Sequence, residues 1–198
     1  IAEVREKQAN LAREAGVTGF CYWHYWFGNG KQLLDMPIRE VLNSGEPDFP
    51  FSLGWANESW KAKVWNPNDT SKDKLLIEQL YPDVEDIEAH FYAILPALKD
   101  KRYIKIENKP IFVIYKPFLL PNAREFIDIW NGLAKENGFS DGFFFIGHTI
   151  NIKEKKQILE LGFDAVNIVR NGEYRFNKEV IKKIPFKLFK FKVLGRPL

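Results

Sequence analysis

The sequence predicts an α/β fold in which a parallel β-sheet is flanked by helices. Short apolar segments rich in β-branched and aromatic residues alternate with segments of helical spacing along the 198 residues. The predicted strands are apolar on both faces, which is typical of parallel sheets. The composition, 45% hydrophobic and 28% charged, is ordinary for a globular domain. An open sheet and a closed barrel share this pattern, and no glycine-rich dinucleotide fingerprint follows any predicted strand.

In the first half of the chain, a helix ends at Gly16, and strands are predicted over 17–23 and 49–55. Residues 32–43 are predicted to form a short helix with Leu34, Ile38, Val41 and Leu42 inward. Residues 56–80 show little periodicity, which predicts a long loop.

The helix capped by Asp83 should bury Val84, Ile87, Phe91, Ile94, Leu95 and Leu98, with His90 on its polar side. Pro96 should kink or end this helix.

In the second half, a short outer strand and a turn at Asn108 precede a buried strand over 111–115. A helix follows over 121–137, with Phe126, Ile129, Trp130 and Leu133 inward. Strands are predicted over 142–148 and 163–169, separated by a helix that begins at an Asn151–Glu154 capping box.

Aromatic and polar residues collect where the predicted strands end. In order along the chain they are His24, Tyr25 and Trp26; Trp55, Asn57, Glu58 and Trp60; Tyr115 and Lys116; His148 and Thr149; Asn167 and Arg170. Ligands of parallel sheets and barrels bind at the carboxyl ends of the strands. We therefore expect these residues to line one pocket.

The residue types in this group favour a sugar. Pyranose rings stack their C–H faces on Trp and Tyr, and their hydroxyls bond to Asn, Glu, His and Lys side chains. Glu58 is the candidate catalytic residue, as a general acid or base; the alternative is that it only accepts hydrogen bonds from substrate hydroxyls. The three histidines are not spaced like metal ligands, and the sequence has no glycine-rich phosphate-binding loop and no Asp-x-Asp pair. We therefore expect neither a metal nor a cofactor.

The charge and the cysteine content limit the classes of binding partner that the sequence predicts. The net charge of +3 gives no global field for nucleic acid or membranes, and Cys21 is the only cysteine. No segment reaches the length of a membrane span. The segment after Glu179 has six basic residues, no acidic ones and interleaved Phe residues. This pattern favours a strand or loop separated from its acidic partners, and the alternative is a peripheral contact with anionic lipid or RNA. We expect a cytoplasmic protein, with any membrane contact at the inner face.

Two blocks of sequence resemble a known family. GVTGFCYWHYWFGNGKQLLDMPIREVLNSGEPDFPFSLGWANESW and KDKRYIKIENKPIFVIYKP are similar to the WbsX-like glycosyltransferases, with the match running over about residues 1–150. The resemblance implies a (β/α)₈ TIM-type barrel related to glycoside hydrolase family 99, the endo-α-mannosidases. It also implies a role in assembling lipopolysaccharide O-antigen or another surface polysaccharide. By motif, His24, Tyr25, Trp26, Trp55, Asn57, Glu58, Trp60 and Tyr115 would line the sugar site.

The chain departs from the family in one respect that bears on catalysis. It has no late Asn-Glu-Trp-x-(x)-Glu-type segment, whose carboxylates perform the chemistry in the related hydrolases. We therefore expect residues 1–198 to form a single partial barrel domain without its first strand and its C-terminal strands. Three functions stay open: a glycosyltransferase, a glycoside hydrolase of the endo-α-mannosidase type, and a non-catalytic carbohydrate-binding or degenerate fragment.

Overall fold

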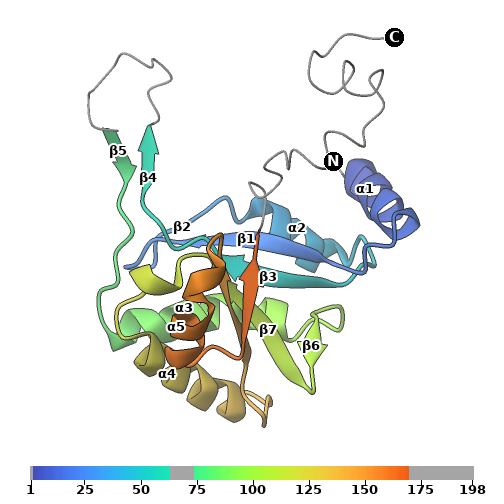
Figure 1. The fold of residues 1–198 in the computed structure, drawn as a ribbon. Helices are drawn as coiled ribbons and strands as arrows, with labels where there is room; N and C mark the ends of the chain where they lie inside the picture. The colour runs from blue at the N-terminus through green and yellow to red at the C-terminus, as the bar shows by residue number, and fades with distance from the viewer. Residues whose placement is uncertain (1, 63–73, 170–198) are drawn as a thin grey trace, which may run out of the picture. The chain divides into compact units, whose positions relative to one another are not determined.

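A computed structural model describes residues 2–62 and 74–169, and in it the chain forms a mixed α/β fold around one parallel sheet (Figure 1). The sheet has seven strands in the order β2-β1-β3-β7-β8-β9, with β6 paired to β7. The pairs β1–β3, β3–β7, β7–β8 and β8–β9 are parallel. The predicted parallel α/β sheet is confirmed, whereas the barrel stays a prediction.

The parallel strands are β1 (Phe20–Trp26), β3 (Phe51–Trp55), β7 (Lys109–Ile114), β8 (Phe144–Thr149) and β9 (Ala165–Ile168). The short antiparallel strands are β2 (Gln32–Leu33) and β6 (Lys105–Ile106), and β4 (Trp60–Ala62) pairs with β5 (Lys74–Ile77) in a separate two-stranded sheet. The helices are α1 (Ala2–Glu14), α2 (Met36–Ser44), α3 (Val84–Leu98), α4 (Ala123–Glu136) and α5 (Lys155–Glu160), with 3₁₀ turns η1 (Pro117–Leu119) and η2 (Ile152–Glu154).

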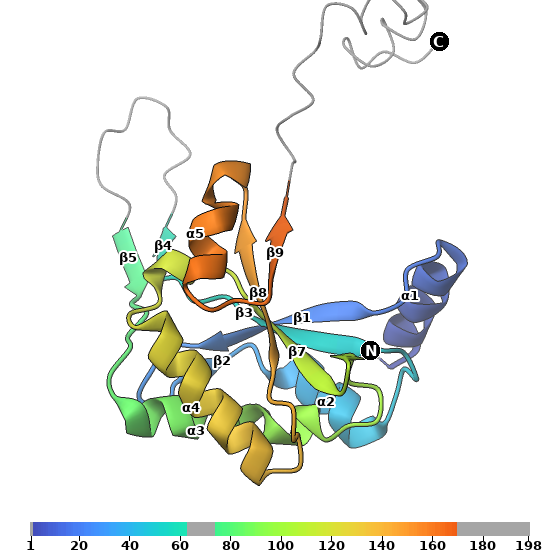
Figure 2. The same ribbon diagram turned by 60° about the horizontal axis from the view of Figure 1, so that its bottom comes forward.

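Helices α3 and α4 lie side by side against one face of the sheet (Figure 2). Trp130 of α4 is fully buried, and its ring contacts those of Phe91, Phe112 and Phe126. Its indole N–H donates to the Ile87 carbonyl of α3, so the polar atom of this large side chain is satisfied. The hydrophobic core therefore lies between the sheet and these helices.

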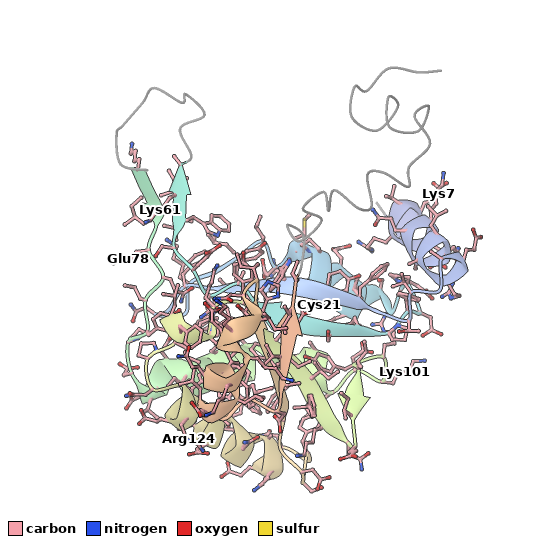
Figure 3. All side chains as sticks on the ribbon, in the orientation of Figure 1. Lys7, Cys21, Lys61, Glu78, Lys101 and Arg124 are labelled. Atoms are coloured by element: carbon pink, nitrogen blue, oxygen red, sulfur yellow. The ribbon has the colours of Figure 1, made fainter. Side chains whose placement is uncertain are left out.

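The opposite face of the sheet is open within the described part of the chain. The side chain of Cys21 on β1 points away from α3 and α4 (Figure 3), and Cys21 is exposed. On β7 and β8, buried and half-buried residues alternate strictly, so each strand has one face against the helices and one face without helical cover. Strand β3, by contrast, is buried along its whole length.

Several predicted boundaries change. Strand β1 runs to Trp26 rather than Trp23, and the predicted helix over 32–43 is preceded by β2, so that Leu34 is 61% exposed. The predicted loop 56–80 contains the β4–β5 hairpin, whose short strands lack a strong period. Pro96 lies inside α3, which ends two residues later at Leu98.

The predicted position of His90 on the polar side of α3 is wrong. His90 is only 1% exposed and faces the sheet, while Val84, expected inward, is 40% exposed. The spacing of the apolar residues alone predicts a buried face of α3 that includes Val84 and excludes His90. A histidine is accommodated in the core because another buried side chain supplies its hydrogen bond.

The described residues include no helix that is long and apolar enough to cross a membrane. Arg170 lies outside the described part of the chain, and so do the basic residues that follow Glu179.

Replacing Trp130 with alanine tests the contribution of the helix layer. Trp130→Ala should lower the free energy of unfolding by about 3–5 kcal/mol, because it leaves a large cavity between α4 and the sheet. Tyr92→Ala is the control, since Tyr92 on α3 is 49% exposed, and it should change the free energy by less than about 1 kcal/mol. Urea unfolding measures both, and equal effects of the two substitutions would contradict the assigned core.

Candidate functional site

Strand β1 sends its aromatic residues to two different faces of the sheet. His24 and Trp26 are 3% and 5% exposed and lie against the helices. Trp23 is 41% exposed on the opposite face, and Tyr25 shares that face by strand alternation. The predicted site group His24, Tyr25 and Trp26 is therefore divided by the sheet.

His24 forms a buried pair with His90 of α3. The two Nε2 atoms are 2.9 Å apart, and the rings stack with their centres 4.9 Å apart. The His90 ring also stacks on Trp26 at 4.9 Å and meets Trp55 edge-on. Burial lowers the pKa of His24 to about 4, and burial together with the neighbouring His24 lowers the pKa of His90 well below its usual value. Both rings are neutral at pH 7.

The hydrogen-bond partners assign the protons of this pair. The Gln32 side-chain amide nitrogen lies 3.4 Å from Nδ1 of His24, so Nδ1 accepts. His24 then carries its proton on Nε2 and donates it to Nε2 of His90. The proton of His90 is consequently on Nδ1.

Trp55 and Asn57, at the end of β3, are also buried. The indole N–H of Trp55 donates to the Trp26 carbonyl at 2.9 Å. Asn57 is 0% exposed, accepts from the Lys116 backbone N–H at 2.8 Å, and donates to the Lys116 carbonyl at 2.9 Å and the Tyr81 hydroxyl at 3.1 Å. These bonds hold the end of β7 beside the end of β3, so Asn57 positions Lys116.

Three side chains meet on the open face near the carboxyl ends of the strands. The ring of Trp23 lies 5.4 Å from Tyr115 and 6.5 Å from His148, edge-on to both. Tyr115 and His148 lie 5.0 Å apart with an interplanar angle of 31°. A Cβ at Gly54 would come within 3.0 Å of the Trp23 ring, so the glycine of β3 leaves room for the indole. We call Trp23, Tyr115 and His148 the open-face cluster.

The charges beside this cluster come from Lys116 and Glu154. The Lys116 Nζ lies 4.5 Å from the centre of the Tyr115 ring, a cation–π arrangement. Burial, and secondarily the Lys116 charge, lowers the pKa of His148, which is therefore neutral at pH 7. The Asn167 amide nitrogen lies 3.2 Å from Nδ1 of His148, which leaves the ring proton on Nε2. His148 thus presents a neutral N–H donor.

A cavity of about 420 Å³ adjoins the open-face cluster. Its walls include Tyr115, Lys116, His148, Thr149 and Glu154. Glu154 bonds to the Thr149 hydroxyl, which fixes the carboxylate at this edge. The cavity combines aromatic faces with a lysine, a glutamate and a neutral N–H donor, so a few polar groups that can orient a ligand stand beside apolar walls.

The other predicted residues lie near the ends of β1 and β3. Trp60 opens β4, and its ring contacts Tyr25 at 5.4 Å and Phe27 at 5.2 Å. Glu58, between β3 and β4, is half-buried. The structure thus brings Tyr115, Lys116 and His148 together, joins Tyr25 to Trp60, and places His24, Trp26, Trp55 and Asn57 in the interior.

Trp23 is the residue of the open face that the strand-end rule missed, although alternation along β1 distinguishes it from His24. Asn167 was recognised only as a strand-end residue, and Glu154 only as a cap. Within residues 2–62 and 74–169, no group of three or more His, Cys, Asp or Glu side chains is arranged to hold a metal ion.

Comparison with known proteins gives one family and a set of fold relatives. The family model described as Glycosyltransferase WbsX matches residues 1–192. The protein described as "Uncharacterized protein WxcX", from two strains of Xanthomonas campestris pv. campestris, is 31% identical over 163 residues, which are 82% of this chain and 22% of that protein. The chain therefore spans about a fifth of the length of these relatives.

Among solved structures, the GH99 endo-alpha-mannosidase from Bacteroides thetaiotaomicron is similar with a TM-score of 0.51 and 16% identity, over 85% of this chain and 43% of that one. A "Glycoside hydrolase-like protein" matches with a TM-score of 0.50 and 13% identity, over 75% of this chain and 44% of that one. At these identities the likeness concerns the fold.

Substituting Asn57 tests the junction between β3 and β7. Asn57→Asp keeps the size but brings a buried carboxylate oxygen against the Lys116 carbonyl, and should lower the free energy of unfolding by about 3 kcal/mol or more. Asn29→Asp is the control, because Asn29 is exposed. Urea unfolding at neutral pH compares the two variants. An Asn57→Asp variant as stable as the wild type would contradict the role of Asn57 in joining the ends of β3 and β7.

The buried histidine pair predicts a pH dependence of stability. The folded-state pKa values lie below the unfolded value of about 6.5, so the unfolded chain binds more protons as the pH falls. Stability should be complete above about pH 6.5 and decline towards about pH 4, by at most about 1.4 kcal/mol per pH unit for each histidine. Urea unfolding at several pH values measures the slope.

The control for this slope is Tyr92→Ala, which removes an exposed ring on α3 and should retain the slope, whereas His24→Phe should reduce it. An unchanged slope in His24→Phe would show that other groups cause the dependence.

Proposed function

The chain belongs to the glycosyltransferase WbsX family, and on that premise we propose that it is part of an enzyme that transfers sugars in the assembly of lipopolysaccharide O-antigen or another surface polysaccharide. The observation that carries this proposal is the open-face cluster of Trp23, Tyr115 and His148 beside a cavity of about 420 Å³. Stacking rings and a neutral N–H donor at the carboxyl edge of a parallel sheet suit a sugar.

Each side chain has a distinct role in this proposal. Trp23 and Tyr115 stack on the C–H face of a sugar ring, and His148 Nε2–H donates to a hydroxyl or ring oxygen. Lys116, positioned by Asn57, supplies a cation for a carboxylate or phosphate group of the donor or acceptor. Tyr25 and Trp60 extend the aromatic surface, and Glu58 acts as general acid or base, or accepts a substrate hydroxyl.

The buried members of the predicted site take supporting roles. His24, Trp26, Trp55 and Asn57 have partners inside the protein. We propose that they position the strand ends rather than contact sugar. The sheet itself is proposed to be part of a (β/α)₈ barrel, because its open face is the face that such a barrel encloses. A cytoplasmic location and contact with the inner membrane face complete the proposal.

A second candidate is hydrolysis of α-mannoside-like linkages. The observation in its favour is the fold likeness to a GH99 endo-alpha-mannosidase, at a TM-score of 0.51. Hydrolysis and transfer share the need for positioned carboxylates, and Glu58 is the carboxylate offered here. Incubation with nucleotide sugars and, separately, with α-mannan oligosaccharides distinguishes the two. Acceptor-dependent release of nucleotide supports transfer, and shortened oligosaccharides support hydrolysis.

Substitution of Trp23 tests the open-face cluster. Trp23→Ala should weaken oligosaccharide binding by roughly tenfold, because an aromatic contact contributes about 0.5–1.5 kcal/mol beyond its buried area. Tyr92→Ala, which removes an exposed ring on α3, should leave affinity unchanged. Isothermal titration calorimetry with α-mannan oligosaccharides measures both. Equal affinities for the wild type and Trp23→Ala would show that the oligosaccharide does not bind at the open-face cluster.

Substitution of Glu58 tests the candidate carboxylate. Glu58→Gln should reduce binding or turnover by roughly tenfold or more, since a hydrogen bond to a charged group contributes about 1.5–3 kcal/mol. Glu6→Gln is a matched control at a half-buried glutamate of α1. If Glu58→Gln changes neither binding nor turnover, Glu58 does not belong to the site.

A further inference from the structure

A second cavity lies on the helix side of the sheet, away from the open-face cluster. It has a volume of about 150 Å³ and is bounded by the first turns of α3 and α4. Trp55, Tyr81 and Phe126 form its aromatic walls. Cavities of about this volume in other proteins hold one six-membered ring. The space therefore fits a single ring rather than a chain of sugars.

His90 contributes a buried polar atom to this cavity. The side chain is 1% exposed and lines the cavity, and its Nε2 is already bonded to His24. The Gln32–His24–His90 chain places the proton of His90 on Nδ1. No hydrogen bond from this proton is found within residues 2–62 and 74–169, and Nδ1 is not among the fully buried side-chain atoms without a partner, so it is accessible from the cavity. A ligand in the cavity would therefore meet a neutral N–H donor at its inner end.

Carboxylates line the outer part of the same cavity. They belong to Asp83, Asp86 and Glu125, and no Lys or Arg is among the lining residues. Asp86 is held in place because it accepts from the Trp26 indole N–H at 3.0 Å and the Gly30 backbone N–H at 3.2 Å. Asp83 is held by the Asp86 backbone N–H at 2.9 Å. These groups repel an anion and accept hydrogen bonds from hydroxyls.

We propose that this cavity binds a single uncharged polyhydroxylated ring, of the size of one pyranose. One oxygen of the ring accepts the Nδ1 proton of His90, and hydroxyls on the opposite side donate to the carboxylates of Asp86 and Glu125. The C–H faces pack on Trp55 and Phe126. An ammonium ion would satisfy the carboxylates but offer no acceptor to His90, and an anion would meet the carboxylates. The proposal rests on these residues and not on the proposed transferase function.

The test uses the whole 198-residue chain with ¹⁵N-labelled histidine. Glucose, galactose and mannose are added separately while the ring signals of His90 are followed by NMR. We expect at least one sugar to shift the His90 Nδ1 signal in a saturable way, with a Kd of roughly 1–10 mM. The His148 signal reports the open face in the same spectrum.

Two cavity variants and two control variants locate the binding. Val84→Phe narrows the cavity at an exposed position of α3 and should weaken the His90 response at least tenfold, while Val17→Phe, at another exposed valine, should leave it unchanged. Glu125→Gln, which alters the outer part without filling it, should weaken the response severalfold. Trp23→Ala should change it less than twofold, because Trp23 lies on the opposite face.

Two results would overturn the proposal. The first is an unchanged His90 signal up to roughly 100 mM of each sugar, which would mean that the cavity holds only water. The second is a response that survives both Val84→Phe and Glu125→Gln but disappears in Trp23→Ala, which would place the sugar on the open face alone. The second result would leave the proposed function intact, so the two proposals are separable.

Discussion

The hydrogen bond between His24 of β1 and His90 of α3 is the interaction on which the arrangement of the site depends. It joins the strand to the helix layer at a point where both rings are almost fully buried. An unpaired imidazole there would cost free energy, so each histidine requires the other. Once His24 faces α3, alternation along the strand directs Trp26 into the core and Trp23 and Tyr25 to the open face. One polar contact thereby decides which tryptophan a ligand on the open face meets.

The same division assigns different tasks to similar residues. Trp26 and Trp55 stack around His90, and the Trp55 indole bonds to the Trp26 carbonyl, so these rings hold strand ends together. Trp23 is large and 41% exposed, so part of its ring is accessible on the open face. Asn57 links the two regions, because its buried amide holds the backbone of Lys116 at the edge of the open-face cavity. Buried polar groups on one side of the sheet therefore position the candidate binding groups on the other.

The described part of the chain has two hollows of different chemistry. The larger one combines Lys116, Glu154 and the N–H of His148. The smaller one is lined by carboxylates, the Asn122 amide, the Tyr81 hydroxyl and the His90 imidazole, and by no Lys or Arg. Both neutral imidazoles have their tautomer set by a side-chain amide, Asn167 for His148 and, through His24, Gln32 for His90.

The sequence by itself determined the order of elements, the parallel sheet, the Asp83 cap and the strand-end location of Tyr115, Lys116 and His148, because these follow from local periodicity and turn chemistry. The motifs around residues 19–60 also identified the family from the sequence. Only the tertiary structure decided which face each strand-end side chain occupies. His24 and His90 are 66 positions apart, and neither has a local signal for burial. Burial of a polar ring depends on a partner brought by folding, and exposure of Trp23 depends on helices covering one face of the sheet and leaving the other open.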